Sequence, residues 1–158
     1  MTTVTGFIEI ERAAQDVFDF VADERNEPTY NPNMLSSTKI TDGPIGVGTR
    51  FAAVHRTRGR PVEMIIEVTE YDRPRRLASH TTMRGADVHG MLTFEPVGAH
   101  TRMEWTWNVR PNRLGWLIAP VVRALGSRQE RSCWTGLKRV LEQHAQDPHR
   151  ERAPRSDV

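Results

Sequence analysis

The side chains that could do chemistry in this chain are few and scattered. His55 could act as a general base, because the intrinsic pKa of histidine lies near neutrality. Ser79 and Thr81 could orient a ligand carbonyl, which is the usual task of isolated polar groups in an apolar pocket, and Gln129 could join them from a later helix. The ordinary alternative for a lone imidazole near a hairpin end is solvation or a hydrogen bond to a neighbour. His55 is therefore the candidate catalytic residue that the sequence offers.

No established catalytic, metal or cofactor motif accompanies these residues. No serine lies in a nucleophile elbow, and no glycine-rich phosphate loop is present. The single cysteine, Cys133, excludes an internal disulfide and a cysteine-rich metal site. His80 and His89 are expected to face each other on the outer side of a hairpin, with Asp87 close by, but structural zinc sites normally have four ligands. The sequence therefore predicts neither a metal nor a cofactor.

The composition of the 158 residues indicates a globular domain, with 37% hydrophobic and 27% charged residues. No apolar run is long enough to cross a bilayer, and the first residues lack a secretory signal pattern, so we expect a cytoplasmic protein. The net charge is only +2 and no recognition motif is present, so nucleic acid is not an expected partner. Residues 146–158 have almost no apolar side chains, which predicts a disordered tail after a domain of residues 1–145.

The candidate residues must be positioned by a strand, two short helices, a series of strands and a long helix. Thr5–Glu11 alternates between apolar and polar residues, and Ala13–Ala22 has apolar residues at helical spacing. A second short helix follows, which Pro28 and Pro32 are expected to end. From Met34 to Arg110 the pattern is that of strands separated by turns.

The apolar phase of these strands places the candidate residues on one face of an antiparallel sheet. Directly opposed residues share a face, so each hairpin loop must bring the apolar phases opposite each other. The four loops satisfy this requirement and have glycine or proline at or beside their tips. The pairs that this register predicts are His55–Val62, Phe51–Ile66, Leu77–Glu70, Ser79–Val68, Thr81–Val88, His80–His89, Phe94–Met103, Leu92–Trp105 and Gly90–Trp107.

The segment from Leu114 to His144 is predicted to be a long amphipathic helix with an apolar stripe that is not straight. Leu117, Val121 and Leu125 share one face, and the apolar residues after position 126 share another. Two explanations remain open. The helix bends near Gly126, or its first half covers a cavity instead of the sheet on which the second half packs.

Five segments resemble the SRPBCC superfamily, which includes START domains and polyketide cyclase/dehydrase-like proteins. They are V-F-D-F-V-A-D (Val17–Asp23), E-R-N-E-P-T-Y-N-P (Glu24–Pro32), G-P-I-G-V-G-T-R-F (Gly43–Phe51), V-T-E-Y-D-R-P-R-R-L (Val68–Leu77) and L-K-R-V-L-E (Leu137–Glu142). The resemblance implies an α+β helix-grip fold, in which a curved antiparallel sheet surrounds a long C-terminal helix, with two short helices after the first strand. It also implies a deep cavity between the sheet and the long helix.

Register and resemblance together predict a protein that binds or transports a small apolar or amphipathic ligand, lipid- or polyketide-like, in that cavity. The enzyme alternative, a polyketide cyclase or dehydratase, needs at least two polar side chains that converge in the cavity with perturbed pKa values. The third alternative, an interaction module of the chaperone-activator type, predicts a filled interior and an exposed functional patch. The expected cavity residues are Phe51, His55, Met64, Ile66, Ser79, Thr81, Leu92, Trp105, Trp107, Leu117, Val121 and Leu125.

Overall fold

A seven-stranded antiparallel sheet dominates the computed structural model, which describes residues 1–57, 59–111 and 131–143. The strand order is β1-β7-β6-β5-β4-β3-β2, so the first two strands of the chain form the two edges. The strands are β1 (Thr2–Ile10), β2 (Met34–Lys39), β3 (Arg50–Thr57), β4 (Arg60–Asp72), β5 (Arg76–Met83), β6 (Ala86–Val97) and β7 (His100–Pro111). The helical segments between β1 and β2 are α1 (Ala14–Ala22), η1 (Glu24–Asn26) and α2 (Glu27–Tyr30).

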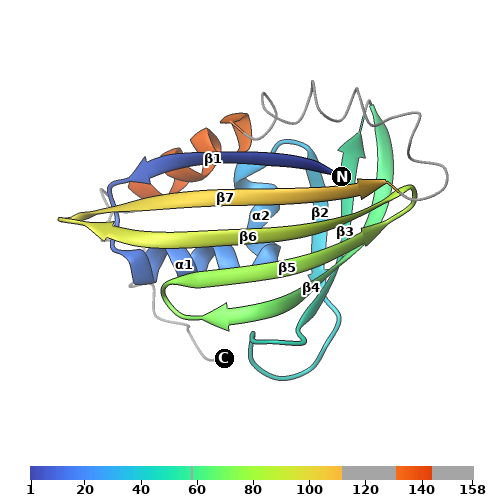
Figure 1. The fold of residues 1–158 in the computed structure, drawn as a ribbon, viewed down its shortest axis with the longest axis horizontal. Coiled ribbons are helices and arrows are strands. Elements are labelled where there is room, and N and C mark those ends of the chain that lie inside the picture. The colour runs from blue at the N-terminus through green and yellow to red at the C-terminus, as the bar shows by residue number, and fades with distance from the viewer. Residues whose placement is uncertain (58, 112–130, 144–158) are drawn as a thin grey trace, which may run out of the picture.

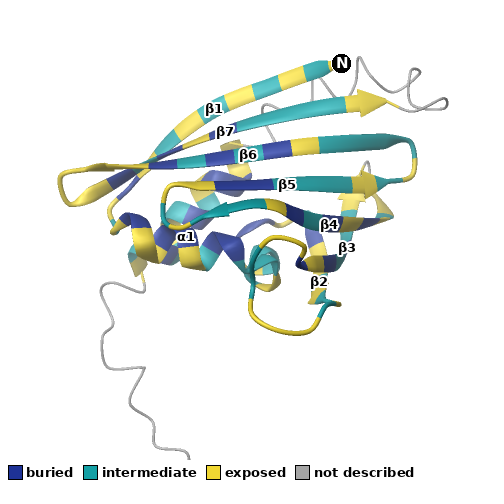
Figure 2. Ribbon diagram, turned by 60° about the horizontal axis from the view of Figure 1, so that its bottom comes forward, coloured by how far each residue is buried: buried dark blue, intermediate teal, exposed yellow. Residues whose placement is uncertain are grey.

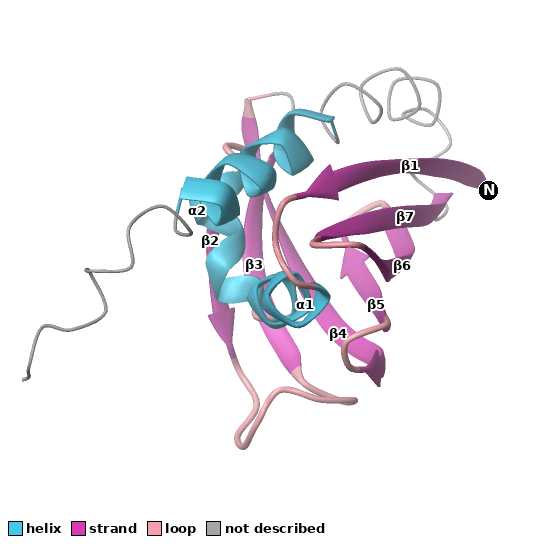
Figure 3. Ribbon diagram, turned by 90° about the vertical axis from the view of Figure 1, so that its left-hand side faces the viewer, coloured by secondary structure: helices cyan, strands magenta, loops and turns pink. Residues whose placement is uncertain are grey.

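The sheet curves around its helices. Figure 1 shows α1, α2 and the C-terminal helical segment 131–143 on one side of the sheet, and Figure 3 shows the strands wrapped around them. Burial alternates along the strands, which is visible as stripes in Figure 2, because one face covers the core and the other meets solvent. The largest fully buried side chains include Phe18 and Phe51. This architecture is the α+β helix-grip fold that the sequence predicts.

The observed register differs from the predicted one at a β-bulge in β4. Leu77 pairs with Tyr71 and not with Glu70, because the register shifts between Val68 and Glu70. A bulge places one extra residue in one strand, and the length of the hairpin loop gives no sign of it. The other predicted pairs are confirmed: His55–Val62, Phe51–Ile66, Ser79–Val68, Thr81–Val88, His80–His89, Phe94–Met103, Leu92–Trp105 and Gly90–Trp107.

The second short helix consists of η1 and α2. Asp23 caps η1, since its side chain accepts a hydrogen bond of 3.2 Å from the backbone N–H of Arg25. Pro28 lies in the first turn of α2, where the missing backbone N–H has no helical partner to lose. The prediction that Pro28 helps to end this helix was therefore wrong: α2 continues to Tyr30.

The helical segment 131–143 is fixed to the first strand and to α2. The Lys138 ammonium donates to the Glu9 carbonyl oxygen at 2.8 Å. Gly136 lies so close to Tyr30 that a Cβ atom there would be 2.2 Å from the Tyr30 carbonyl oxygen. Within the described ranges, no helix has the length and apolar content that a bilayer crossing requires. The predictions for Leu117, Val121, Leu125, Gly126, Gln129 and the tail 146–158 fall outside the described residues.

Candidate functional site

A cavity of about 80 Å³ lies between the sheet, the short helices and the C-terminal helix. The sheet supplies a mainly apolar wall with one hydroxyl group, and the short helices supply a cluster of polar side chains. The C-terminal helix supplies a thiol and an indole. The lining residues are Val21, Glu24, Glu27, Tyr30, Asn31, Leu77, Ser79, Gly90, Leu92, Trp107, Cys133 and Trp134.

Stacked aromatic rings form part of the cavity wall. The Trp134 ring centroid lies 6.3 Å from those of Trp107 and Tyr30, with interplanar angles of 19° and 27°. It lies 5.5 Å from the centroid of Trp105. Gly90 makes room for this group, because a Cβ atom there would come within 2.0 Å of the Trp107 ring. The rings therefore come from β7, α2 and the C-terminal helix, and packing between these elements fixes them.

The polar end of the cavity is built on η1 and α2. Glu24 and Glu27 are three residues apart, so consecutive turns place both carboxyl groups on one side, and both side chains are half-buried. The Asn31 amide Nδ2 donates to Glu27 Oε1 at 2.7 Å. The Asn31 side-chain oxygen in turn accepts from the backbone N–H of Asn33 at 3.0 Å, which fixes the orientation of the amide.

The surroundings of the Glu24 carboxyl disfavour its ionised form. Burial raises the pKa of the Glu24 carboxyl well above its usual range, and the negative charge of Glu27, a hydrogen bond with Glu27 and the charge of Asp23 raise it further. Two carboxylates in one desolvated site cannot both ionise easily. The Glu24 carboxyl therefore retains its proton at pH values where exposed glutamates have lost theirs. A carboxyl that keeps its proton beside a second carboxyl can serve as a general acid.

His55 is within electrostatic reach of Glu27 but is not among the residues that line the cavity. Burial lowers the pKa of its imidazole, and the negative charge of Glu27 partly opposes that effect. His55 Nδ1 lies 3.3 Å from Thr57 Oγ1, so the hydroxyl holds one edge of the ring. The lowered pKa favours a neutral imidazole, which is the form that can accept a proton.

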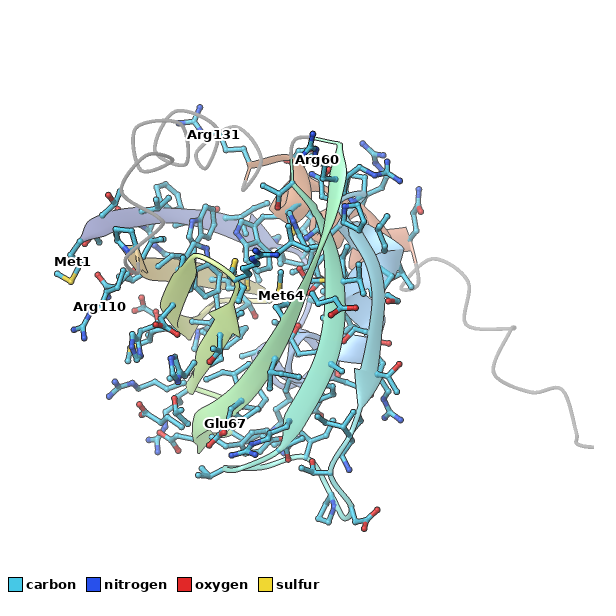
Figure 4. The ribbon with its side chains drawn as sticks, turned by 90° about the vertical axis from the view of Figure 1, so that its right-hand side faces the viewer. Met1, Arg60, Met64, Glu67, Arg110 and Arg131 are labelled. Atoms are coloured by element: carbon cyan, nitrogen blue, oxygen red, sulfur yellow. The ribbon has the colours of Figure 1, made fainter. Side chains whose placement is uncertain are left out.

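The structure divides the predicted cavity residues into three groups. Ser79, Leu92 and Trp107 line the cavity. His55 and Thr81 lie on the same inward face and are half-buried. The residues packed into the buried core are Phe51, Met64, Ile66 and Trp105. Figure 4 shows Met64 of this last group on β4, beside the side chains that fill the space enclosed by the sheet.

Sequence reasoning missed Glu24 and Glu27, because the segment that contains them was interpreted for the fold alone. A signal was nevertheless present. Glu24, Glu27 and Tyr30 recur every three residues, and so share one face of a helical segment. Tyr30 is an aromatic residue that is expected to be buried, so the two carboxyl groups are expected to face the interior with it.

Residues 1–142 match the family described as polyketide cyclase/dehydrase and lipid transport. The match covers the strands, the short helices and nearly all of the described C-terminal segment. No curated protein matches the chain. The family match agrees with the resemblance to the SRPBCC superfamily that the sequence motifs indicate.

Solved structures similar to this chain share its fold. An aromatase/cyclase, ZhuI, from Streptomyces sp. R1128 is 12% identical, with a TM-score of 0.80 over 91% of this chain and 95% of that chain. A START superfamily protein from Mycobacterium smegmatis is 15% identical, with a TM-score of 0.78 over 89% and 97%. The protein TTHA0849 from Thermus thermophilus is 21% identical, with a TM-score of 0.75 over 87% and 95%. These structures confirm the helix-grip fold.

Proposed function

Given that the chain belongs to the polyketide cyclase/dehydrase and lipid transport family, we propose that it binds a small apolar or amphipathic molecule in the cavity between the sheet and the helices. The observation that carries this proposal is the composition of the cavity, which has aliphatic and aromatic walls and a polar cluster at one end. In such pockets the apolar walls provide affinity and the few polar groups fix orientation.

The cavity volume limits what can enter without movement of the wall. About 80 Å³ has room for a few water molecules, whereas small-molecule pockets span roughly 300–1,000 Å³. A ligand of ordinary size therefore has to displace side chains. Trp107 and Trp134 line the cavity and stack on each other, so their separation is the expected response to a ligand.

Tryptophan fluorescence tests the binding proposal. Linear alcohols and flat polycyclic compounds are expected to change the emission saturably. Leu92→Phe, which fills the cavity from β6, is expected to weaken the affinity by about tenfold or more. Met91→Phe is the matched control, because it adds the same ring at the next residue of β6, on the opposite face of the sheet. Circular dichroism checks that both variants fold. The proposal fails if no compound perturbs the emission or if the two variants behave alike.

Acid–base catalysis on the bound molecule is the second candidate function, and the Glu24–Glu27 pair favours it. The enzyme alternative requires polar side chains that converge with perturbed pKa values, and the pKa of Glu24 is raised by burial. A cyclase or dehydratase would release water from a polyketide-like substrate, which mass spectrometry detects. Glu24→Gln is expected to abolish that loss of water while binding persists. Unchanged turnover in this variant would exclude the glutamate from catalysis.

A further inference from the structure

Among the described residues, the carboxyl pair of Glu24 and Glu27 has more acceptor oxygens than donors directed at it. Each carboxyl group of the Glu24–Glu27 pair has two oxygens, and the pair holds a single proton when Glu24 is protonated. The donor that the structure directs at Glu27 is the Asn31 amide, at 2.7 Å. The remaining carboxyl oxygens can therefore accept hydrogen bonds from a molecule in the cavity.

The charges around this end disfavour an anion. Among the described residues that line the cavity, none is a lysine or an arginine. The negative charge of Asp23 also acts on Glu24. The Arg25 guanidinium forms an ion pair with the Asp23 carboxylate at 2.7 Å, and Arg25 is not among the residues that line the cavity. His55 lies outside the cavity lining, and burial lowers the pKa of its imidazole, which disfavours the cationic form. An incoming carboxylate would thus meet the charge of Glu27 and find no lysine or arginine among the described lining residues.

We infer that the cavity selects neutral apolar molecules that carry a hydroxyl group over fatty-acid anions, with Glu24 and Glu27 as the residues that determine this specificity. The inference rests on the proposed function and adds a ligand class to it. The ligand O–H donates to a free carboxyl oxygen of the pair, and the apolar remainder lies against Leu77, Leu92 and Trp107. A fatty-acid carboxylate loses its hydration and is repelled by Glu27. A cationic amine can donate to the same oxygens, but its ammonium loses far more hydration on entering an apolar cavity than a hydroxyl does, and Asn31 already donates to Glu27.

A matched ligand series tests the inference on the full chain. Isothermal titration calorimetry at pH 8 compares decanol, methyl decyl ether, decanoate and decylamine, which differ only in the polar end. Decanol is expected to bind about tenfold or more tightly than decanoate, and also more tightly than the ether, which cannot donate a hydrogen bond. Equal affinity for decanol and decanoate, or tightest binding of decylamine, would overturn the inference and leave the binding function standing. Absence of binding by all four probes would overturn both.

Variants assign the selectivity to the carboxyl pair. Glu27→Gln removes the charge and keeps the side-chain shape, so it is expected to reduce the preference for decanol over decanoate by about tenfold. Glu63→Gln is the control, because this substitution removes the same charge at an exposed position of β4, outside the cavity. An unchanged preference in folded Glu27→Gln would show that the pair does not select the ligand. If Glu27→Gln does not fold, the ligand series on the unmodified protein still decides the question.

Discussion

At the scale of residues, the raised pKa of Glu24 determines in which direction pH changes the stability of the fold. Its pKa is raised in the folded protein, mainly by burial, above the ordinary value of 4.5. The folded state therefore binds more protons than the unfolded state once the pH exceeds that value. The stability contributed by this group is fully present below pH 4.5 and is lost as the pH rises through the folded pKa.

Glu24→Gln is expected to raise the free energy of unfolding at pH 8 by about 1 kcal/mol, because glutamine stays neutral where the ionised, half-buried glutamate is penalised. At pH 4 the gain is expected to disappear. Urea denaturation at the two pH values measures the difference, with the exposed Glu63→Gln as the control. A variant less stable than the unmodified protein at pH 8 would contradict burial as the main cause of the raised pKa.

At the scale of elements, the contact between the helical segment 131–143 and α2 positions one side of the cavity. Gly136 approaches the Tyr30 carbonyl oxygen so closely that any Cβ atom would overlap it, at 2.2 Å. Alanine is ordinarily more favourable than glycine inside a helix by about 1 kcal/mol. Here the overlap is with backbone, which cannot rotate away as a flexible side chain could. Overpacking therefore outweighs helix propensity at this position.

Gly136→Ala is accordingly expected to lower the free energy of unfolding by about 1–3 kcal/mol and to shift the tryptophan emission, since Trp134 lies on the same segment. Gly46→Ala is the control, because its Cβ atom would have nothing within 4 Å. Chemical denaturation and fluorescence measure both effects. A stabilising Gly136→Ala would mean that the two segments are farther apart than the structure shows.

At the scale of the whole molecule, the sequence predicts a domain of residues 1–145 followed by a tail of residues 146–158. The composition of residues 146–158 predicts that they contribute little to folding, because so few apolar side chains cannot offset the entropy of ordering. Truncation after Ala145 is expected to leave the melting temperature and ligand affinity unchanged. A fall of more than about 3 °C in a thermal melt would show that the tail stabilises the domain.

The sequence by itself determined the sheet and the face that it presents to the helices. Alternation with a period of two, together with the loop lengths, set pairs such as Phe51–Ile66 and Leu92–Trp105, because a slip of one residue would expose the whole apolar face. The same reasoning placed on the inward face three residues that line the cavity in the structure: Ser79, Leu92 and Trp107. It needed only local spacing and the pairing of neighbouring strands.

Only the tertiary structure decided which inward residues surround a cavity and which fill the core. Phe51 and Leu92 both face inward, but only Leu92 borders the cavity, since that outcome depends on where α2 and the segment 131–143 pack. The β4 bulge also leaves no trace in the loop lengths. The raised pKa of Glu24 arises mainly from burial in the folded protein. No local pattern contains that information, because desolvation is a property of the assembled fold.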